Sequence, residues 1–484
     1  MQYGTILNIL GTLLMIFSLS AVPPIVVNEL YHESVWFPFA ASLSITLFTG
    51  ITLKSLCYKY RRNDLRPRDG FLIVVLFWVV LSVFSALPFL IAANPDVSFT
   101  DAFFEAISGI TTTGASVLHD IDFMPHSILF YRQELEFLGG MGIIVLALAV
   151  LPILGIGGMQ LYRAEVPGPM KEEKLTPRLA ESAKMLWYIY VGLVLICAFS
   201  YWAAGMSTFD AICESFGTIS TGGFSPHEAS FAFYHSSSIN LIGIVFMILG
   251  SVSFASHFLV LKQKSLAPYR KDVELKTFLM LLFLVTVVLC VSLYYFVHEA
   301  TTLHAIISDA FDVVSVMSTT GFVSSKFSTW PRFLPTMMMI IAIVGGCAAS
   351  TSGGIKVVRF LLMYKQSVRE IKRLIHPNAI IPIRMGKRVL PDHIVETIWS
   401  FVSVYILLFI TLILILMATG INLDTAFGAL AASLSNTGAS IAGVANGYEG
   451  LSDIAKWTLM FAMLAGRLEI FSLLVLFSPA FWRH

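Results

Sequence analysis

Four short stretches decide the fold of this 484-residue chain: Thr112-Thr113-Gly114-Ala115, Ser220-Thr221-Gly222-Gly223, Thr319-Thr320-Gly321-Phe322 and Asn436-Thr437-Gly438-Ala439. Each contains a Thr-Gly pair that follows a small hydroxyl or amide residue. Each also follows a mildly apolar run of about a dozen residues, too short to cross a bilayer, and lies between two longer apolar runs that could cross one. We interpret the four stretches as one structural unit used four times.

The Thr-Gly pairs have a physical explanation inside a membrane. A helix that ends there leaves its last carbonyl groups unpaired, and non-helical backbone persists at that depth only where it lines a cavity or is covered by protein. Glycine allows successive carbonyl groups to face one axis, and four such strands would form rings of oxygens that replace the water shell of a cation. The C-terminal ends of four short helices would direct partial negative charge at the same axis. The sequence therefore predicts a cation pore.

The composition indicates a polytopic membrane protein. Hydrophobic residues make up 57% of the chain, charged residues only 13%, and the mean hydropathy is +0.80. Soluble domains carry roughly a quarter charged residues. The formal net charge is +1, so we expect no nucleic-acid partner. The five cysteines show no metal-binding spacing, and we interpret them as small core residues.

The basic residues predict the orientation of the chain. Of 31 lysines and arginines, 26 lie in one set of connecting segments: 54–68, 163–184, 262–276, 356–388 and the C-terminal Arg483. The positive-inside rule makes this set cytoplasmic. Arg132, Lys326, Arg332 and Lys456 fall in the opposite loops. Ten spans, counted from the repeats, also place both termini on the cytoplasmic side, so we expect a multi-pass protein with both ends in the cytoplasm.

The apolar runs divide the chain into five parts. We expect an all-α membrane fold in which two extra N-terminal helices precede four repeats of helix, pore loop and helix around one pseudo-four-fold pore. The expected parts are 1–69 for the two extra helices, 70–178 for the first repeat, 179–271 for the second, 272–390 for the third and 391–484 for the fourth.

The short apolar segments resemble one another at their starts. Asp101-Ala102-Phe103, Asp210-Ala211-Ile212 and Asp309-Ala310-Phe311 open three of them, and Asp424 opens a spaced version. Aspartate is a common helix N-cap, so we expect these carboxylates to cap four pore helices from the outer side. Glu105 and Glu214 lie near the expected pore mouth, and we expect them to hydrogen-bond within the pore-helix region.

The chain resembles the Trk/Ktr/HKT superfamily of potassium transporters, and most closely its bacterial Trk potassium-uptake membrane subunit. Four Thr-Gly loops in one polypeptide carry the resemblance over nearly the whole chain, and the two extra N-terminal helices match the Trk branch. Further matching stretches are 138–142, 157–165 and 466–471. The resemblance implies potassium uptake across the bacterial inner membrane by a membrane homodimer, contacting lipid and regulated by a cytoplasmic nucleotide-binding ring of the TrkA type.

The resemblance also implies which residues bind the potassium ion. In related plant proteins, serine at the first glycine position accompanies sodium transport, so Gly114 favours potassium. The expected filter comprises Thr111, Thr112, Thr113 and Gly114; Ile219, Ser220, Thr221 and Gly222; Ser318, Thr319, Thr320 and Gly321; and Ser435, Asn436, Thr437 and Gly438.

The second span of the third repeat contains a glycine-rich segment whose composition predicts a gate. Residues 345–354 include four glycines and three hydroxyl residues, and each glycine costs a helix roughly 0.5–1 kcal/mol. We expect the helix to break there, with Gly345, Gly346, Gly353 and Gly354 forming a loop under the filter that blocks the ion path. Arg467 is the cation placed deep in an apolar run, and we expect it to lie beside the pathway as an electrostatic barrier that anchors this loop. The alternatives are an ion pair with Glu469, although residues two apart on a helix do not face each other, and hydrogen bonds to carbonyls left free where the helix of the third repeat breaks.

Two other function classes were weighed against a channel. A secondary symporter, coupled to protons or sodium, would use broken helices near the midplane, and the sequence leaves this coupling open. A membrane-embedded enzyme is disfavoured because the chain has no HExxH, no GxSxG and no paired aspartates within spans. The chain also lacks a GxxxxGK[ST] motif, so any nucleotide effect would come from a partner.

Overall fold

The computed structural model describes residues 2–60, 67–145, 179–297, 302–325, 327–331, 333–386 and 388–483. The described chain is helical apart from loops and one two-stranded ribbon, β1 (Arg384–Met385) and β2 (Arg388–Val389), so the expected all-α class is confirmed. Part of the first repeat, including the family-like stretch 157–165, lies outside the described residues.

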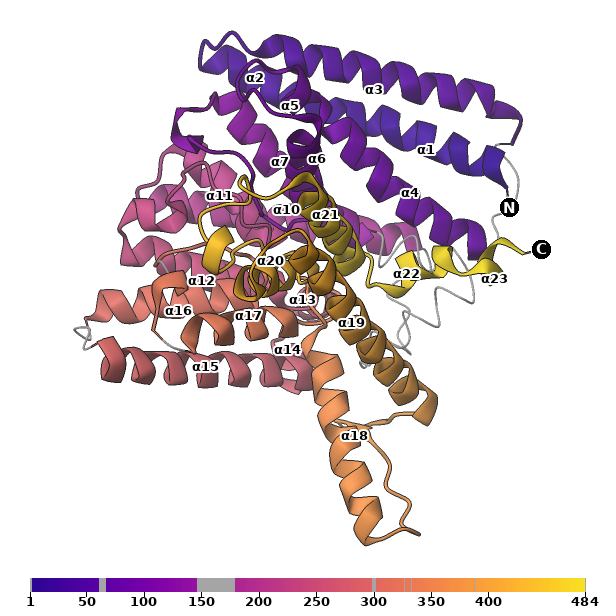
Figure 1. Ribbon diagram of the computed structural model, residues 1–484, viewed down its shortest axis with the longest axis vertical. Helices are drawn as coiled ribbons and strands as arrows, with labels where there is room; N and C mark the ends of the chain where they lie inside the picture. The colour runs from indigo at the N-terminus through magenta and orange to yellow at the C-terminus, as the bar shows by residue number, and fades with distance from the viewer. Residues whose placement is uncertain are drawn as a thin grey trace.

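The N-terminal helices pack closely along one edge of the molecule (Figure 1). They comprise α1 (Tyr3–Phe17), α2 (Val22–Leu30), joined to α1 by the 3-10 turn Ser18–Ala21, and α3 (Trp36–Leu56). Gly11 and Gly50 face each other where α1 crosses α3, since a Cβ on Gly11 would lie 2.8 Å from the Gly50 carbonyl oxygen. Small residues at such crossings allow two membrane helices to approach.

Four short helices lie at the centre: α6 (Phe99–Ile110), α11 (Thr208–Ser220), α16 (Leu303–Met317) and α20 (Leu423–Leu434). Further helices surround them: α4 (Pro67–Ser85), α5 (Leu87–Ile91), α7 (His126–Val145), α10 (Leu179–Ala203), α12 (Ser237–Ser251), α15 (Val273–Val297), α17 (Leu334–Val344), α19 (Asp392–Ala418) and α21 (Asp453–Arg467). Packing follows a closed circle in the order α6, α7, α11, α12, α16, α17, α20, α21 and back to α6. The circle gives each short helix an equivalent neighbourhood.

The aspartates that were expected to cap the short helices do not occupy the capping positions. Ser98 caps α6 and Ser207 caps α11, each accepting a hydrogen bond from the backbone N–H of the aspartate three residues later. Thr302 caps α16, so Asp309 lies inside that helix, and Asn422 precedes α20. Aspartate caps helices as well as serine does, so the helix start decides the outcome: Ser98 and Ser207 precede the first helical residue, while Asp101 and Asp210 lie in the first turn, where negative charge is favourable.

Three of the outer helices break, where the sequence predicted one break. As expected, α17 ends at Val344 and α18 (Val357–Ile375) begins after the glycine-rich loop. In addition, α12 bends by 94° into α13 (Phe254–Gln263), and α21 bends by 109° into α22 (Phe471–Leu474) and a following 3-10 turn. Among the described residues, six helices are long and apolar enough to span a membrane, or eight if each bent pair is one span.

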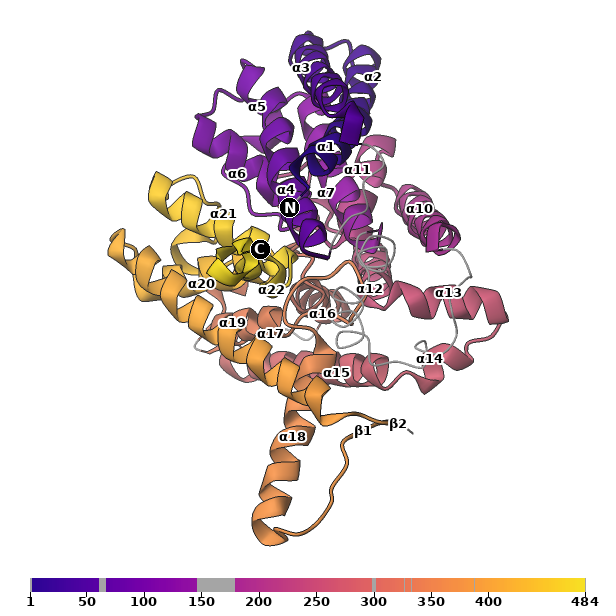
Figure 2. The same ribbon diagram turned by 90° about the vertical axis from the view of Figure 1, so that its right-hand side faces the viewer.

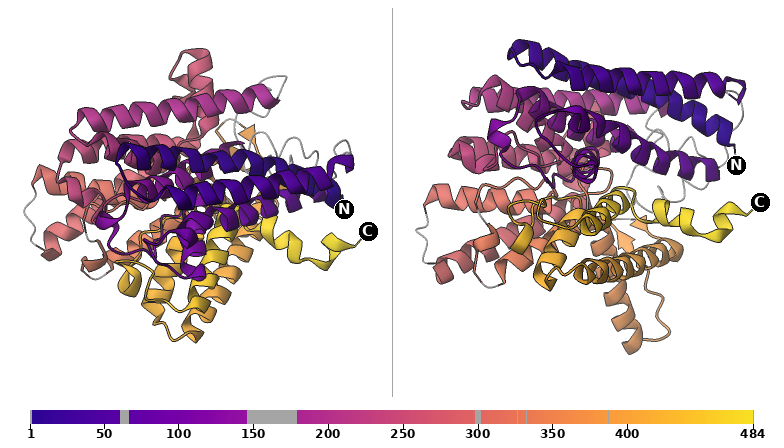
Figure 3. Two further views of the ribbon diagram at one scale, coloured as in Figure 1. Left: turned by 90° about the horizontal axis from the view of Figure 1, so that it is seen from above. Right: turned by 45° about the horizontal axis from the view of Figure 1, so that its top comes forward.

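The remaining elements lie at the two ends of the bundle. They are α14 (Ala267–Lys271), α23 (Pro479–Trp482) and the 3-10 helices Tyr58–Tyr60, Ile121–Phe123, Ser230–Tyr234, Phe327–Thr329, Ala442–Val444 and Val475–Phe477. Helix α18 projects away from the bundle together with the β-ribbon (Figure 2). The two chain ends lie near each other in Figures 1 and 3, which fits an even number of crossings.

Candidate ion pathway

The four loops that follow the short helices meet in a closed ring, and glycine makes this possible. Gly114, Gly223, Gly321 and Gly438 have φ angles of 76°, 98°, 86° and 73°. A Cβ on each would overlap a carbonyl oxygen of the next loop around the ring. The pairs are Gly114 with Gly222, Gly223 with Thr320, Gly321 with Thr437 and Gly438 with Thr113. Each loop therefore touches the next, and the fourth touches the first.

The ring corrects the register expected for the second loop. The backbone N–H groups of Thr113, Gly222, Thr320 and Thr437 donate equivalent hydrogen bonds to carbonyls five residues earlier, at 2.8, 2.9, 2.8 and 2.8 Å. Gly222 thus corresponds to the threonines, and Gly223 to the glycines of the other loops. The second loop is Ser220-Thr221-Gly222-Gly223, and Ile219 lies within α11. The Gly-Gly pair allowed two alignments in sequence, and only the backbone angles distinguish them.

Hydroxyl groups hold three of the loops in the same way. The side chains of Thr111 and Thr113 are hydrogen-bonded at 2.8 Å, those of Ser318 and Thr320 at 2.7 Å, and those of Ser435 and Thr437 at 2.8 Å. The residue two positions before the glycine of the corrected register has a positive φ in each of the four loops: Thr112, Thr221, Thr319 and Asn436. Non-glycine residues rarely adopt this conformation, and such strain is concentrated at functional sites.

A cavity of about 440 Å³ opens outside the ring, and all four glycines of the corrected register line it. His119, Arg132 and Glu228 are among its other lining residues. The backbone of the four loops therefore lines a cavity, which is one of the settings in which a membrane interior tolerates non-helical backbone.

Three buried carboxylates brace the outer stems of the loops. Glu105 accepts hydrogen bonds from the Val117 N–H at 3.0 Å and from Ser116, and Glu214 accepts one from Ser225 at 2.6 Å. Asp312 accepts the Ser324 N–H at 2.7 Å. These contacts agree with the expectation that Glu105 and Glu214 hydrogen-bond within the pore-helix region.

Arg132 joins the first and second loops behind this frame. Its Nε lies 2.8 Å from Glu105 Oε1, and the two side chains are 1% and 0% exposed. The guanidinium also lies 4.2 Å from the centre of the Phe224 ring and donates to the Ser225 carbonyl at 3.4 Å. A buried ion pair of this kind is costly to break, because removing one partner leaves an unpaired charge.

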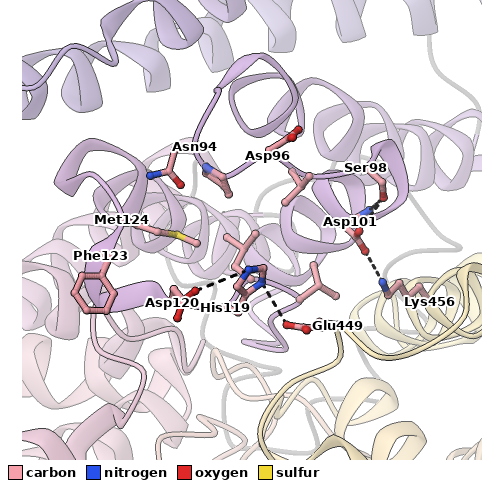
Figure 4. Close-up of a pocket in the computed structure, with 14 residues that line it drawn as sticks. Asn94, Asp96, Ser98, Asp101, His119, Asp120, Phe123, Met124, Glu449 and Lys456 are labelled. Atoms are coloured by element: carbon pink, nitrogen blue, oxygen red, sulfur yellow. Dashed lines mark hydrogen bonds and ion pairs between the residues drawn. The ribbon is translucent and has the colours of Figure 1, made fainter.

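A second outer cavity, of about 680 Å³, lies between the first and fourth loops (Figure 4). At its wall Lys456 of α21 pairs with Asp101 of α6 at 2.6 Å, and His119 lies 3.3 Å from Glu449. The contact between Lys456 and Asp101 ties the last repeat to the first, as a closed ring requires.

The glycine-rich loop 345–354 lies against the inner side of the ring. The Gly353 N–H donates to Thr319 Oγ1 at 2.6 Å, and a Cβ on Gly353 would overlap the Ser435 carbonyl oxygen. Thr351 Oγ1 donates to the carbonyls of Ile219 at 2.9 Å and Gly250 at 3.0 Å. Gly345 and Gly354, both with φ of 74°, cross each other where the loop starts and ends.

Arg467 lies at the C-terminal end of α21 and points at this loop. Its Nη1 donates to the Thr351 carbonyl at 2.9 Å and its Nη2 to the Gly139 carbonyl at 3.4 Å, and the side chain is 5% exposed. Glu469 instead lies 2.5 Å from Arg359 of α18. The guanidinium therefore satisfies the Thr351 carbonyl, in the segment where the helix of the third repeat breaks, which is one of the roles that the sequence allowed.

The structure brings the sequence-predicted residues together in two layers. The ring contains the named residues of loops one, three and four and, in the second loop, Ser220, Thr221 and Gly222; the layer below contains Gly345, Gly346, Gly353, Gly354 and Arg467. Sequence reasoning missed Gly223, which the adjacent Gly222 concealed, and Thr351, which looked like one hydroxyl among several. It also missed Glu136 of α7, whose carboxylate lies directly behind Gly222.

Comparison with known proteins agrees with this geometry. The family model TrkH, described as cation transport protein, matches residues 38–484. The chain belongs to the TrkH family. It is 47% identical to the Trk system potassium uptake protein TrkH of Halomonas elongata and 45% identical to that of Escherichia coli K12, with both chains fully covered in each comparison. The crystal structure of the potassium transporter TrkH from Vibrio parahaemolyticus is similar with a TM-score of 0.91, 44% identity and full coverage of both chains. These family relatives are named as transport proteins and not as enzymes.

Proposed function

We propose that this protein takes up potassium ions through a selective pore formed by the ring of four loops. The observation that carries the proposal is the closed ring of glycines, in which each loop leaves no room for a side chain on the next. Such close approach holds the loops rigidly around one ring, and carbonyl oxygens in such a ring can replace the water shell of a cation. The names of the family relatives support potassium as the substrate.

The filter residues follow the corrected register. We assign four segments to the filter, one from each loop: residues 111–114, 220–223, 318–321 and 435–438. The potassium ion is the transported substrate and not a resident cofactor. Positions 113, 222, 320 and 437 contribute the carbonyls that face the neighbouring glycines.

The loop 345–354 is the proposed gate, and Arg467 is its proposed anchor. The loop hydrogen-bonds to Thr319 of the ring, so in this conformation it stands directly beneath the filter. An arginine held there by a loop carbonyl also places positive charge beside the path of a cation. Shortening the loop should raise ion flux and leave selectivity unchanged, because the ring itself is untouched.

The cellular setting follows from the family and from the charge pattern. We infer a bacterial inner-membrane protein with both termini in the cytoplasm, acting as a homodimer with a nucleotide-binding ring of the TrkA type. The projecting helix α18 carries Arg369, Lys372 and Arg373 on the side that the positive-inside rule makes cytoplasmic, where anionic lipid and a partner would be available. The five parts 1–69, 70–178, 179–271, 272–390 and 391–484 remain the proposed units.

The decisive experiment measures potassium flux through purified protein in liposomes, under a sodium gradient and then under a proton gradient. A channel gives passive flux that ignores both gradients and prefers potassium to sodium. Uphill potassium movement tied to one gradient would establish the symporter alternative. Flux without preference for potassium would contradict the filter assignment.

A further inference from the structure

The second loop differs from the other three at the position of a supporting threonine. The hydroxyl groups of Thr113, Thr320 and Thr437 are each hydrogen-bonded to the hydroxyl group of the residue two positions earlier. Gly222 stands at the equivalent place and has no side chain. Ser220, which should be the other half of the pair, makes only a long 3.4 Å hydrogen bond with the Gly217 carbonyl.

A carboxylate from another repeat fills the missing volume. A Cβ built on Gly222 would lie 2.6 Å from Glu136 Oε1 and would overlap the rest of the carboxylate. Gly217, one turn earlier in α11, gives room on the other side, because its Cβ would lie 3.1 Å from Glu136 Oε2. The other loops have Ser108, Ser315 and Ala432 at the position of Gly217. Two glycines therefore form a niche that admits Glu136.

Glu136 also bonds to the loop that it supports. Its Oε1 accepts the Phe224 N–H at 2.8 Å, immediately after the last filter residue of the second loop. The side chain is fully buried. The matching positions on α12 and α21 hold Met247 and Met463, three residues before glycines that approach their own pore helices just as Gly139 does. A carboxylate at this place belongs to the first repeat alone.

We propose that Glu136 is the positioning residue of the second filter loop and replaces the threonine that the other loops contain. It fills the space behind Gly222 and holds Phe224 N–H, and so fixes the Gly222 carbonyl that faces Gly114. Its role is one of shape and hydrogen-bond acceptance, because Oε2 has no hydrogen-bond partner and an unpaired buried charge would be costly. This inference rests on the proposed filter and names a determinant of its selectivity.

The backbone allows a direct exchange of one support for the other. Gly222 is not among the residues with positive φ, so its backbone suits a threonine, and the three atoms nearest to a Cβ built there all belong to the Glu136 carboxylate. In the double variant Gly222→Thr with Glu136→Ala, the new hydroxyl can pair with Ser220 as in the third and fourth loops. The exchange would make the ring more nearly four-fold.

The test compares potassium and sodium flux of five proteins in liposomes: wild type, Glu136→Ala, Glu136→Gln, Gly222→Thr and the double variant. Glu136→Ala leaves the buried Phe224 N–H without its acceptor, so it should lower the potassium-to-sodium flux ratio by about tenfold. Glu136→Gln keeps the acceptor and the shape and should stay within about twofold of wild type. Gly222→Thr alone should lose flux, and the double variant should recover the ratio.

The control is Glu134→Ala, which removes the same atoms from the same helix two positions away, on a different face. It should keep the wild-type flux ratio. An equal loss of the flux ratio in Glu136→Ala and Glu136→Gln would overturn the inference, because it would show that the negative charge of Glu136 matters and its shape does not. The inference would also fail if the double variant folds as a monodisperse protein but does not recover the flux ratio. A wild type without potassium preference would instead disprove the filter itself.

Discussion

The filter loops and the intramembrane loop 345–354 are both non-helical backbone surrounded by helices, yet they are held in different ways. Each filter loop bonds through main-chain N–H groups to its own short helix, as Thr320 does to Ser315 at 2.8 Å. The intramembrane loop is held largely by other elements, through Thr319, Gly250 and Arg467. The filter loops can therefore remain in place when helices shift, while the intramembrane loop can exchange its partners. One arrangement suits selection of ions, and the other suits gating.

The largest effect is expected from a substitution in the ring of four loops, the rigid part of this comparison. In Gly321→Ala the new Cβ would overlap the Thr437 carbonyl oxygen at a φ of 86°. Backbone strain and overpacking each cost about 1–3 kcal/mol, so potassium-selective flux should fall at least about thirtyfold in liposomes. Gly205→Ala is the matched control, since Gly205 has a φ of 104° and no neighbour within 4 Å. If both variants lose flux equally, strain alone explains the effect and the contact between loops does not.

A smaller effect of opposite sign, a rise in flux, is expected when the contacts of the intramembrane loop 345–354 are removed. Arg467→Ala removes the hydrogen bonds to the carbonyls of Thr351 and Gly139. Hydrogen bonds to charged groups contribute about 1.5–3 kcal/mol, so potassium flux should rise roughly tenfold, with the potassium-to-sodium ratio unchanged. Arg369→Ala, which breaks the pair between Arg369 of the projecting helix α18 and Asp392 at the start of α19, should leave flux near wild type. Wild-type flux in a folded Arg467→Ala protein would contradict the anchoring role.

Thr351→Val tests the neutral contacts of the same loop. The valine keeps the shape and loses the hydrogen bonds to the Ile219 and Gly250 carbonyls. Neutral hydrogen bonds contribute about 1 kcal/mol, so flux should rise only about fivefold, again at constant selectivity. Ser350→Ala is the control, because Ser350 bonds to Cys347 within the loop itself. A change in selectivity would show that the two layers are not independent.

The sequence predicted the four loops of the ring and the helix break at 345–354 because both depend on local composition. Glycine and hydroxyl residues at membrane depth have few structural roles, so Gly114, Gly321, Gly438 and the run 345–354 were recognisable. The register of the second loop was wrong because Gly222 and Gly223 are chemically identical, and the φ angle that separates them depends on the neighbouring loops. No local pattern could have linked Glu136 to Gly222, since the two residues come from different repeats.

The breaks in α12 and α21 escaped prediction for a related reason. At the second break, Glu469 and Ile470 have φ of 53° and 52°, a conformation that neither residue favours by itself. Tertiary contacts hold this segment, including the pair between Glu469 and Arg359. A helix break that contains several glycines can therefore be predicted from composition. A helix break at larger residues is imposed by tertiary packing and is visible only in the structure.

The smallest expected effect concerns the rigid outer frame and its dependence on pH. His227, on the outer stem of the second loop, lies 3.0 Å from Asp122 and 3.4 Å from Asp210. Burial lowers its pKa, but hydrogen bonding to these two carboxylates outweighs burial, with a further contribution from Glu214, and the net pKa is raised. A raised pKa in the folded state stabilises the protein below the ordinary histidine pKa, and this contribution is lost as pH rises through the raised value.

Thermal unfolding measured in detergent at pH 6 and pH 8.5 should therefore differ between wild type and His227→Gln. Partly exposed ion pairs contribute up to about 1 kcal/mol, so the advantage of wild type should be about 1 °C in Tm at pH 6 and should vanish at pH 8.5. The flux ratio should not change with this substitution, because the filter glycines keep their contacts around the ring. If the Tm advantage of wild type grew as pH rises, its sign would contradict a stabilising protonated His227. It would show that the neutral imidazole of His227 holds the outer frame.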